Sequence, residues 1–160
     1  MYQNAPAYEF DLERSRESVE QILRICGEKG RILVLMQNNP DPDALASAAA
    51  LRDLVSHRLR KRVTIGYAGI CGRAENQAML RVLRIDAKRL DPEALERYAT
   101  ICLVDTQPQS GNNALYTARP ADIVIDHHIP TRKGRPVNAR FADIRPDFGA
   151  TATILYEYGL

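Results

Sequence analysis

The sequence has little of several features that would assign a protein to a class. None of its 160 residues is tryptophan, and its cysteines are Cys26, Cys71 and Cys102. These cysteines are far apart and form no CxxC pair, so the sequence indicates neither a disulfide framework nor a zinc-thiolate site. Cys102 lies inside an apolar run and is expected to be buried. No apolar run approaches bilayer-spanning length and the N-terminus does not resemble a signal peptide, which predicts a cytoplasmic protein with no membrane association.

The net charge and the length of the chain further restrict the kinds of protein it could be. The formal net charge of +2 is too small to indicate nucleic-acid binding from charge alone. With 45% apolar residues, a chain of this length is expected to fold around one core. Residues 1–30 are expected to form an N-terminal packing helix, over about 11–26, ahead of an α/β domain at 31–160.

Apolar runs alternate with helical patterns along the chain. Residues 32–36, 63–68, 100–104 and 122–126 are predicted to be buried strands, because β-branched and aliphatic residues follow one another without polar alternation. Helical spacing or capping signals are found after each of the first two strands, at 91–98 and at 149–158. The expected fold is α/β, a doubly wound, mainly parallel sheet of four to five strands flanked by helices.

Ionisable residues follow three of the four predicted strands. Asp41 and Asp43 lie in the segment NNPDPD after the first strand, and Asp105 follows the third. The fourth ends in Asp126, His127 and His128, within ADIVIDHHIP. Taken singly, each motif has an ordinary interpretation: the triplet as a polar loop, Asp43 as the cap of a helix that begins near it, and Asp41 as a turn former.

Together these residues predict a metal site. In a parallel sheet the carboxyl ends of the strands share one edge, where ligands bind. Carboxylates gathered there are unfavourable unless their pKa values shift or a cation neutralises them. With imidazole present, the ligand set suits Mn²⁺, zinc or iron more than calcium. Two such ions bridged by carboxylates can activate water for attack on phosphorus.

Four ordered segments, NPDPDALAS, LVDTQP, IDHHIP and GATATIL, resemble the successive motifs of the DHH phosphoesterase superfamily, the RecJ-like group that includes nanoRNases. The resemblance runs from about Ile32 to Leu155. It implies a two-manganese site that hydrolyses phosphodiester or phosphoanhydride bonds, with Mg²⁺ as an alternative ion. The substrate would be a nucleotide or short oligonucleotide, and a homodimer is compatible with the sequence.

The resemblance also implies roles for individual residues. Those carried over as metal ligands are Asp41, Asp43, Asp105 and His127. His128 would contact the scissile phosphate, and Asp126 would support it. The candidates for substrate binding are Asn39, Ser47, Arg73 and Arg132.

The sequence departs from the family pattern in three respects. Gln37 stands where the family usually has a histidine ligand, and an amide oxygen binds transition metals less well than imidazole. The chain ends before a further metal-binding aspartate, and it lacks the family's DHHA1 domain. We therefore expect either roughly the front half of a larger protein or a natural or engineered truncation.

Two alternatives to a hydrolase stay open. A non-catalytic metal- or nucleotide-binding module with a degenerate site would account for Gln37. An aspartyl-phosphate phosphatase would use Asp41 and Asp43 as nucleophile and acid, but it leaves His127 and His128 without a role. The basic residues between Arg132 and Arg145 are interpreted as solvated surface, with contacts to substrate phosphates as the alternative.

Overall fold

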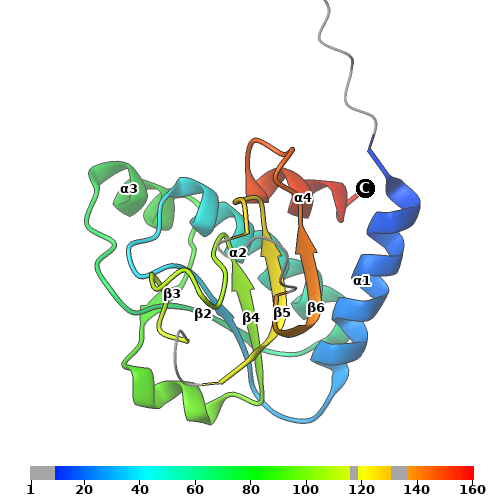
Figure 1. Cartoon of the computed structure of the whole chain (residues 1–160). Helices are drawn as coiled ribbons and strands as arrows, with labels where there is room; N and C mark the ends of the chain where they lie inside the picture. Colours follow the sequence, from blue (N-terminus) through cyan, green and yellow to red (C-terminus); the bar gives the residue numbers. More distant parts are fainter. Residues whose placement is uncertain (1–9, 116–118, 131–136) are drawn as a thin grey trace, which may run out of the picture.

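The computed structural model describes residues 10–115, 119–130 and 137–160. In this part of the chain six strands form one parallel sheet in the order β3-β2-β1-β4-β5-β6 (Figure 1). The strands are β1 (Ile32–Leu35), β2 (Val63–Tyr67), β3 (Ala87–Arg89), β4 (Thr100–Val104), β5 (Ala121–Asp126) and β6 (Ala139–Ile144). The α/β prediction is confirmed, with one strand more than the four to five expected.

The helices distribute over the two faces of the sheet. They are α1 (Leu12–Gly27), α2 (Pro42–Leu59), α3 (Ala74–Val82), α4 (Thr151–Glu157) and the 3-10 helix η1 (Pro92–Arg97). Residues of α1, α2 and α4 pack on one face with Val34, Cys102 and Ile123 of the strands. On the other face, Leu95 of η1 packs with strand residues such as Leu33 and Leu103. Adjacent residues of β1 thus enter different cores, which is why this strand has no polar alternation.

The two edge strands, β3 and β6, were not predicted from the sequence. β3 reads Ala-Lys-Arg and has no buried residue, and β6 buries only Phe141 and Asp143. Each pairs with a single neighbour, β2 or β5. Edge strands of this kind carry too few apolar residues to be recognised by pattern, because backbone pairing with the neighbouring strand defines them.

The start of α2 differs by one residue from the prediction. The helix begins at Pro42, and its cap is Asp41, whose carboxylate accepts a hydrogen bond from the Ala44 amide at 3.0 Å. Proline is favoured at the first helical position because it has no N–H to leave unpaired. Asp43 therefore lies inside the first turn, and its carboxylate is available for other contacts.

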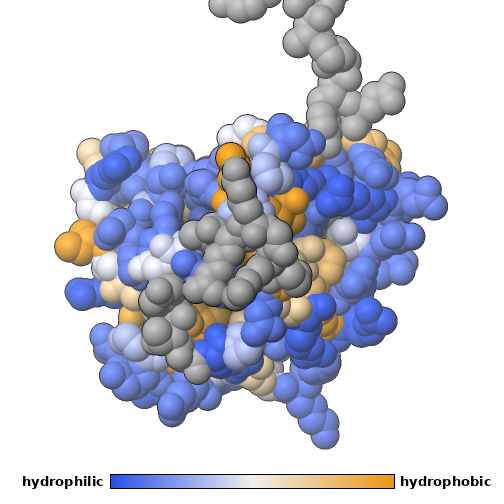
Figure 2. Space-filling view, in the orientation of Figure 1, coloured by the Kyte–Doolittle hydropathy of each residue, from blue (hydrophilic) through white to orange (hydrophobic). Residues whose placement is uncertain are grey.

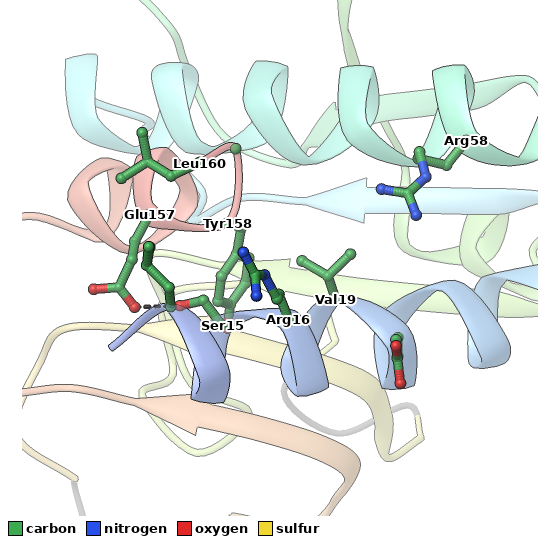
Figure 3. A pocket seen from close by; sticks show the side chains of 10 residues that line it. Ser15, Arg16, Val19, Arg58, Glu157, Tyr158 and Leu160 are labelled. Carbon is green, nitrogen blue, oxygen red and sulfur yellow. Dashed lines mark hydrogen bonds between the residues drawn. The ribbon is translucent and has the colours of Figure 1, made fainter. Parts of the chain in front are cut away.

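A buried ionic cluster joins the ends of the described chain. Arg145 donates to Glu157 at 2.7 Å and lies 2.7 Å from a carboxylate oxygen of Asp143, and all three are almost fully buried. Ser15 of α1 hydrogen-bonds Glu157 beside a cavity of about 300 Å³ between α1 and the end of α4 (Figure 3). The Tyr158 hydroxyl donates to Asp143 at 2.6 Å. The interpretation of Arg145 as solvated or phosphate-binding is therefore wrong.

On the face seen in Figure 2 hydrophilic residues predominate, and several of the apolar areas lie beside the atoms drawn in grey. Among the described helices, none combines the length and apolarity that a membrane crossing requires.

Candidate metal centre

The polar segments after β1, β4 and β5 meet at one edge of the sheet. β1 and β4 are neighbours in the sheet, and the chain continues from β1 to β2 on one side and from β4 to β5 on the other, so the loops after β1 and β4 diverge. In doubly wound sheets this is the point where a ligand-binding crevice forms at the carboxyl ends of the strands. The structure therefore brings together residues that are far apart in sequence.

His127 faces two carboxylates. Its Nδ1 atom lies 3.1 Å from the carbonyl oxygen of Phe148, an acceptor, so Nδ1 carries the proton of the neutral ring. Nε2 then presents its lone pair, and it lies 3.7 Å from Oδ2 of Asp43 and 3.7 Å from Oδ1 of Asp105. A backbone carbonyl that fixes the second ring nitrogen is the usual support of a metal-binding histidine.

Asp43 links the site to α4. Its two carboxylate oxygens accept hydrogen bonds from the backbone amides of Thr151 and Ala152, each at 2.8 Å. These amides belong to the first turn of α4, which has no cap from its own preceding residue. Asp43 therefore caps the helix from a distant part of the sequence, and this contact fixes its carboxylate next to His127.

Asp105 is the most perturbed acid of the site. It is 2% exposed, its φ is +58°, and its Oδ1 accepts a hydrogen bond from the Thr151 hydroxyl at 3.0 Å. Burial and the nearby charge of Asp43 raise the pKa of Asp105 to about 8. A left-handed backbone at a non-glycine residue and a strongly shifted pKa are both typical of functional positions.

His128 stands beside His127 and is held by Asp126. The two imidazole rings are 4.4 Å apart between centroids, and Nδ1 of His128 lies 2.8 Å from Oδ1 of Asp126. Partial burial acts to lower the pKa of His128, but the hydrogen bond and charge of Asp126 outweigh it and raise the pKa above its ordinary value. Among the described residues, potential ligand atoms of Asp105, His127 and His128 lie within 4.8 Å of one another.

Two further predicted residues contribute to the site through Asp43 and α2. Ser47 is completely buried and its hydroxyl lies 3.4 Å from Oδ1 of Asp43, a position that supports Asp43 and does not face a substrate. The half-buried Asp41 caps α2 and adds negative charge near Asp105 and His128.

The other candidates for substrate binding lie at the margin. Oδ1 of Asn39 accepts a hydrogen bond from the Ile70 amide at 2.9 Å, which joins the loops after β1 and β2. Arg73 is exposed just before α3 and, within the described part of the chain, forms no ion pair. Arg132 lies outside the described residues.

Gln37 contacts a neighbouring loop. Its Oε1 accepts a hydrogen bond from the side-chain amide of Asn112 at 3.2 Å, and the backbone amide of Asn38 donates to the carbonyl of Asn112. The loop after β4 thus contacts the side chain that stands at the position of the family's histidine.

The role of this loop, residues 106–113, was not predicted from the sequence. Gln107 is 3% exposed, and its amide donates to Asp126 at 2.8 Å and to the carbonyl of His128 at 3.0 Å. Four side-chain amides and two hydroxyls within TQPQSGNN are the signal in the sequence, but the partners of Gln107 lie about twenty residues away along the chain.

The motifs, their order and their convergence at one edge agree with a comparison against protein families. The model of the DHH family, N-terminal domain, matches residues 31–159. The chain belongs to the DHH family. The resemblance drawn from the four sequence motifs is thereby confirmed.

Two other proteins are similar to this DHH chain. The uncharacterized protein MJ1633 of Methanocaldococcus jannaschii is 39% identical over 132 residues, which is 82% of this chain and 26% of that protein. An exopolyphosphatase-related protein from Bacteroides fragilis has a similar fold, with a TM-score of 0.58 and 14% identity. The similarity covers 89% of this chain and 43% of the other. The chain therefore spans about a quarter of the curated relative and less than half of the solved one.

Proposed function

We propose that this chain carries the metal centre of a hydrolase that cleaves phosphodiester bonds in nucleotides or short oligonucleotides, with manganese as the preferred ion. The observation that carries the proposal is the approach of His127 Nε2 to carboxylate oxygens of Asp43 and Asp105, both at 3.7 Å. An imidazole nitrogen with carboxylate oxygens from two residues near it suits a divalent transition metal.

The donor set fits such an ion. His127 is fixed in the tautomer that leaves Nε2 free, and Asp43 is oriented by two backbone amides. Asp105 would bridge, and Asp41 would complete the set from the cap of α2. A bound divalent ion would supply Lewis-acid activation of a phosphoryl group and of water. The pKa of Asp105 favours the proposal, because a buried acid that keeps its proton without a cation loses it when one binds.

The remaining residues have roles that need no ion. His128 is the more exposed of the two histidines and has an elevated pKa, so its ring suits contact with an anionic phosphate oxygen. Asp126 is fully buried and compensates the charge on that ring. Hydrolysis at this site would therefore pair a cationic His128 with the charge that develops on the phosphate.

The decisive experiment compares hydrolysis by wild type, Asp105→Asn and Asp86→Asn. Asp86 is an exposed aspartate at the start of β3 and serves as the matched control. The panel contains a dinucleotide, a nucleoside monophosphate and tripolyphosphate, each with Mn²⁺ or Mg²⁺. We expect dinucleotide cleavage in wild type and Asp86→Asn, and a loss of at least about 100-fold in Asp105→Asn. Equal activity in all three proteins would refute the proposal, and cleavage of tripolyphosphate alone would replace the substrate class.

One observation favours a second candidate, a metal- or nucleotide-binding module without catalysis. Gln37, at the position of the family's histidine, is bonded to Asn112. Under this alternative the wild type binds fewer than two ions and does not hydrolyse the panel. The Gln37→His substitution then restores the second ion, and elemental analysis of manganese-loaded protein distinguishes the two cases.

A further inference from the structure

Gln107 joins two segments of the site, the one after β4 and the one after β5, by side-chain hydrogen bonds. It follows Asp105 by two residues, in the loop after β4, and it reaches the segment after β5. Its side-chain amide donates to Oδ2 of Asp126 at 2.8 Å and to the carbonyl oxygen of His128 at 3.0 Å. Gln107 is 3% exposed and Asp126 is fully buried, so water does not compete for these hydrogen bonds.

The chemistry of the two partners fixes the orientation of the amide. A carboxylate oxygen and a carbonyl oxygen are both acceptors, and only the NH₂ group of glutamine can donate to them. The same NH₂ group therefore serves both residues that flank His127. Asp126 in turn has one oxygen toward Gln107 and the other toward Nδ1 of His128, at 2.8 Å.

The loop holds the backbone of Gln107 as firmly as its side chain. The carbonyl oxygen of Gln107 accepts hydrogen bonds from the backbone amide of Ser110 at 3.0 Å, the Ser110 hydroxyl at 2.9 Å and the Asn113 side chain at 2.9 Å. Three donors to one carbonyl leave the residue little freedom to move. Such support is expected of a residue whose side chain must keep a fixed position.

We infer that Gln107 is a positioning residue for His128, acting through Asp126. The inference rests on the proposed function, because it assigns His128 a task at the phosphate. The neutral amide donates a hydrogen bond to Oδ2 of Asp126 and leaves the negative charge of Asp126 in place. An arginine or lysine at this position would cancel that charge. Oδ1 therefore keeps a full negative partner for Nδ1–H of His128, and Nε2 is the ring nitrogen left for the substrate.

The first test is a spectroscopic one that does not depend on catalysis. Two-bond ¹H–¹⁵N correlation spectra of the imidazoles, recorded with Mg²⁺ at one fixed pH at which His128 is neutral, report which ring nitrogen carries the proton. His128→Gln assigns the signals among His57, His127 and His128. We expect Nδ1–H alone in wild type and a several-fold rise of the Nε2–H form in Gln107→Ala and Gln107→Glu. Gln107→Glu keeps the size and shape of the side chain but replaces the NH₂ donor by a carboxylate that faces the carboxylate of Asp126. Gln109→Ala, an exposed residue of the same loop, should match wild type.

The second test is steady-state hydrolysis of the dinucleotide with Mn²⁺. Loss of a residue that supports an active-site group costs roughly 10–100-fold, here expected in kcat with KM nearly unchanged, while manganese stoichiometry stays that of wild type. Unchanged tautomers in both Gln107 variants, or an unchanged kcat, would overturn the inference. If the wild type hydrolyses nothing, the proposed function fails and the tautomer populations alone decide the role of Gln107.

Discussion

Replacement of Asp105 by asparagine should stabilise the metal-free protein at neutral pH. The carboxyl group is buried, and burial together with the charge of Asp43 raises its pKa to about 8, against an ordinary value of 3.8. The folded state therefore binds this proton more tightly than the unfolded state does. Its contribution to stability is fully present below about pH 4 and is lost as the pH rises towards 8.

The magnitude follows from the size of the shift. In the unfolded chain the carboxyl has its ordinary pKa, and pH 7 lies about three units above that value. Each unit corresponds to about 1.4 kcal/mol, so keeping the proton in the folded state costs on the order of 4 kcal/mol at pH 7. Asparagine avoids this loss, keeps an acceptor for the Thr151 hydroxyl and tolerates the positive φ of residue 105. We expect a gain of about 2–4 kcal/mol at pH 7, or roughly 5–15 °C in Tm for a domain of this size.

Urea unfolding with a chelator present, at pH 4.5 and pH 8, measures the effect. The gain should be at most about 1 kcal/mol at the lower pH and several times larger at the higher one. Added Mn²⁺ should stabilise the wild type and leave Asp105→Asn unchanged, because ligand binding to the folded state raises its stability. Asp86→Asn is the control for loss of one negative charge. A variant less stable than wild type at pH 8, or a gain that does not depend on pH, would refute the assignment of a raised pKa to Asp105.

Three substitutions test other contacts of the fold. Arg145→Met leaves Glu157 buried without its cation and Asp143 with Arg14 alone, and should cost about 3–5 kcal/mol in urea unfolding. Arg140→Met, which removes an exposed pair with Glu28, should change the urea midpoint little; equal losses in the two variants would contradict the burial argument. Thr151→Val removes the hydrogen bond to Asp105 and should cost about 1–2 kcal/mol at pH 8, with the titration of Asp105 moved to higher pH in ¹³C carboxyl spectra. Gly69→Ala places a methyl group against the carbonyl oxygen of Asn38, closer than van der Waals contact allows, so we expect about 1–3 kcal/mol of destabilisation by thermal unfolding. A neutral result would show that the loops after β1 and β2 separate freely.

The sequence alone determined the central strands and the chemistry at their ends. β1, β2, β4 and β5 are apolar runs, a pattern that arises because both faces of a parallel sheet are covered. A parallel sheet places all strand ends at one edge, so the meeting of Asp43, Asp105 and the two histidines could be predicted without coordinates. The four motifs were enough to identify the family.

Only the tertiary structure decided how those residues are supported. Asp43 caps α4 across more than a hundred residues, His127 is oriented by the carbonyl of Phe148, and Gln107 holds Asp126 from another strand. None of these partners is a neighbour in the sequence, and none belongs to a periodic pattern. Arg145 shows the same limit, since a guanidinium in a basic stretch is expected on the surface until two distant carboxylates enclose it. Periodicity in a sequence reports which face of an element is buried, whereas hydrogen bonds between distant loops depend on where the folded chain places their ends.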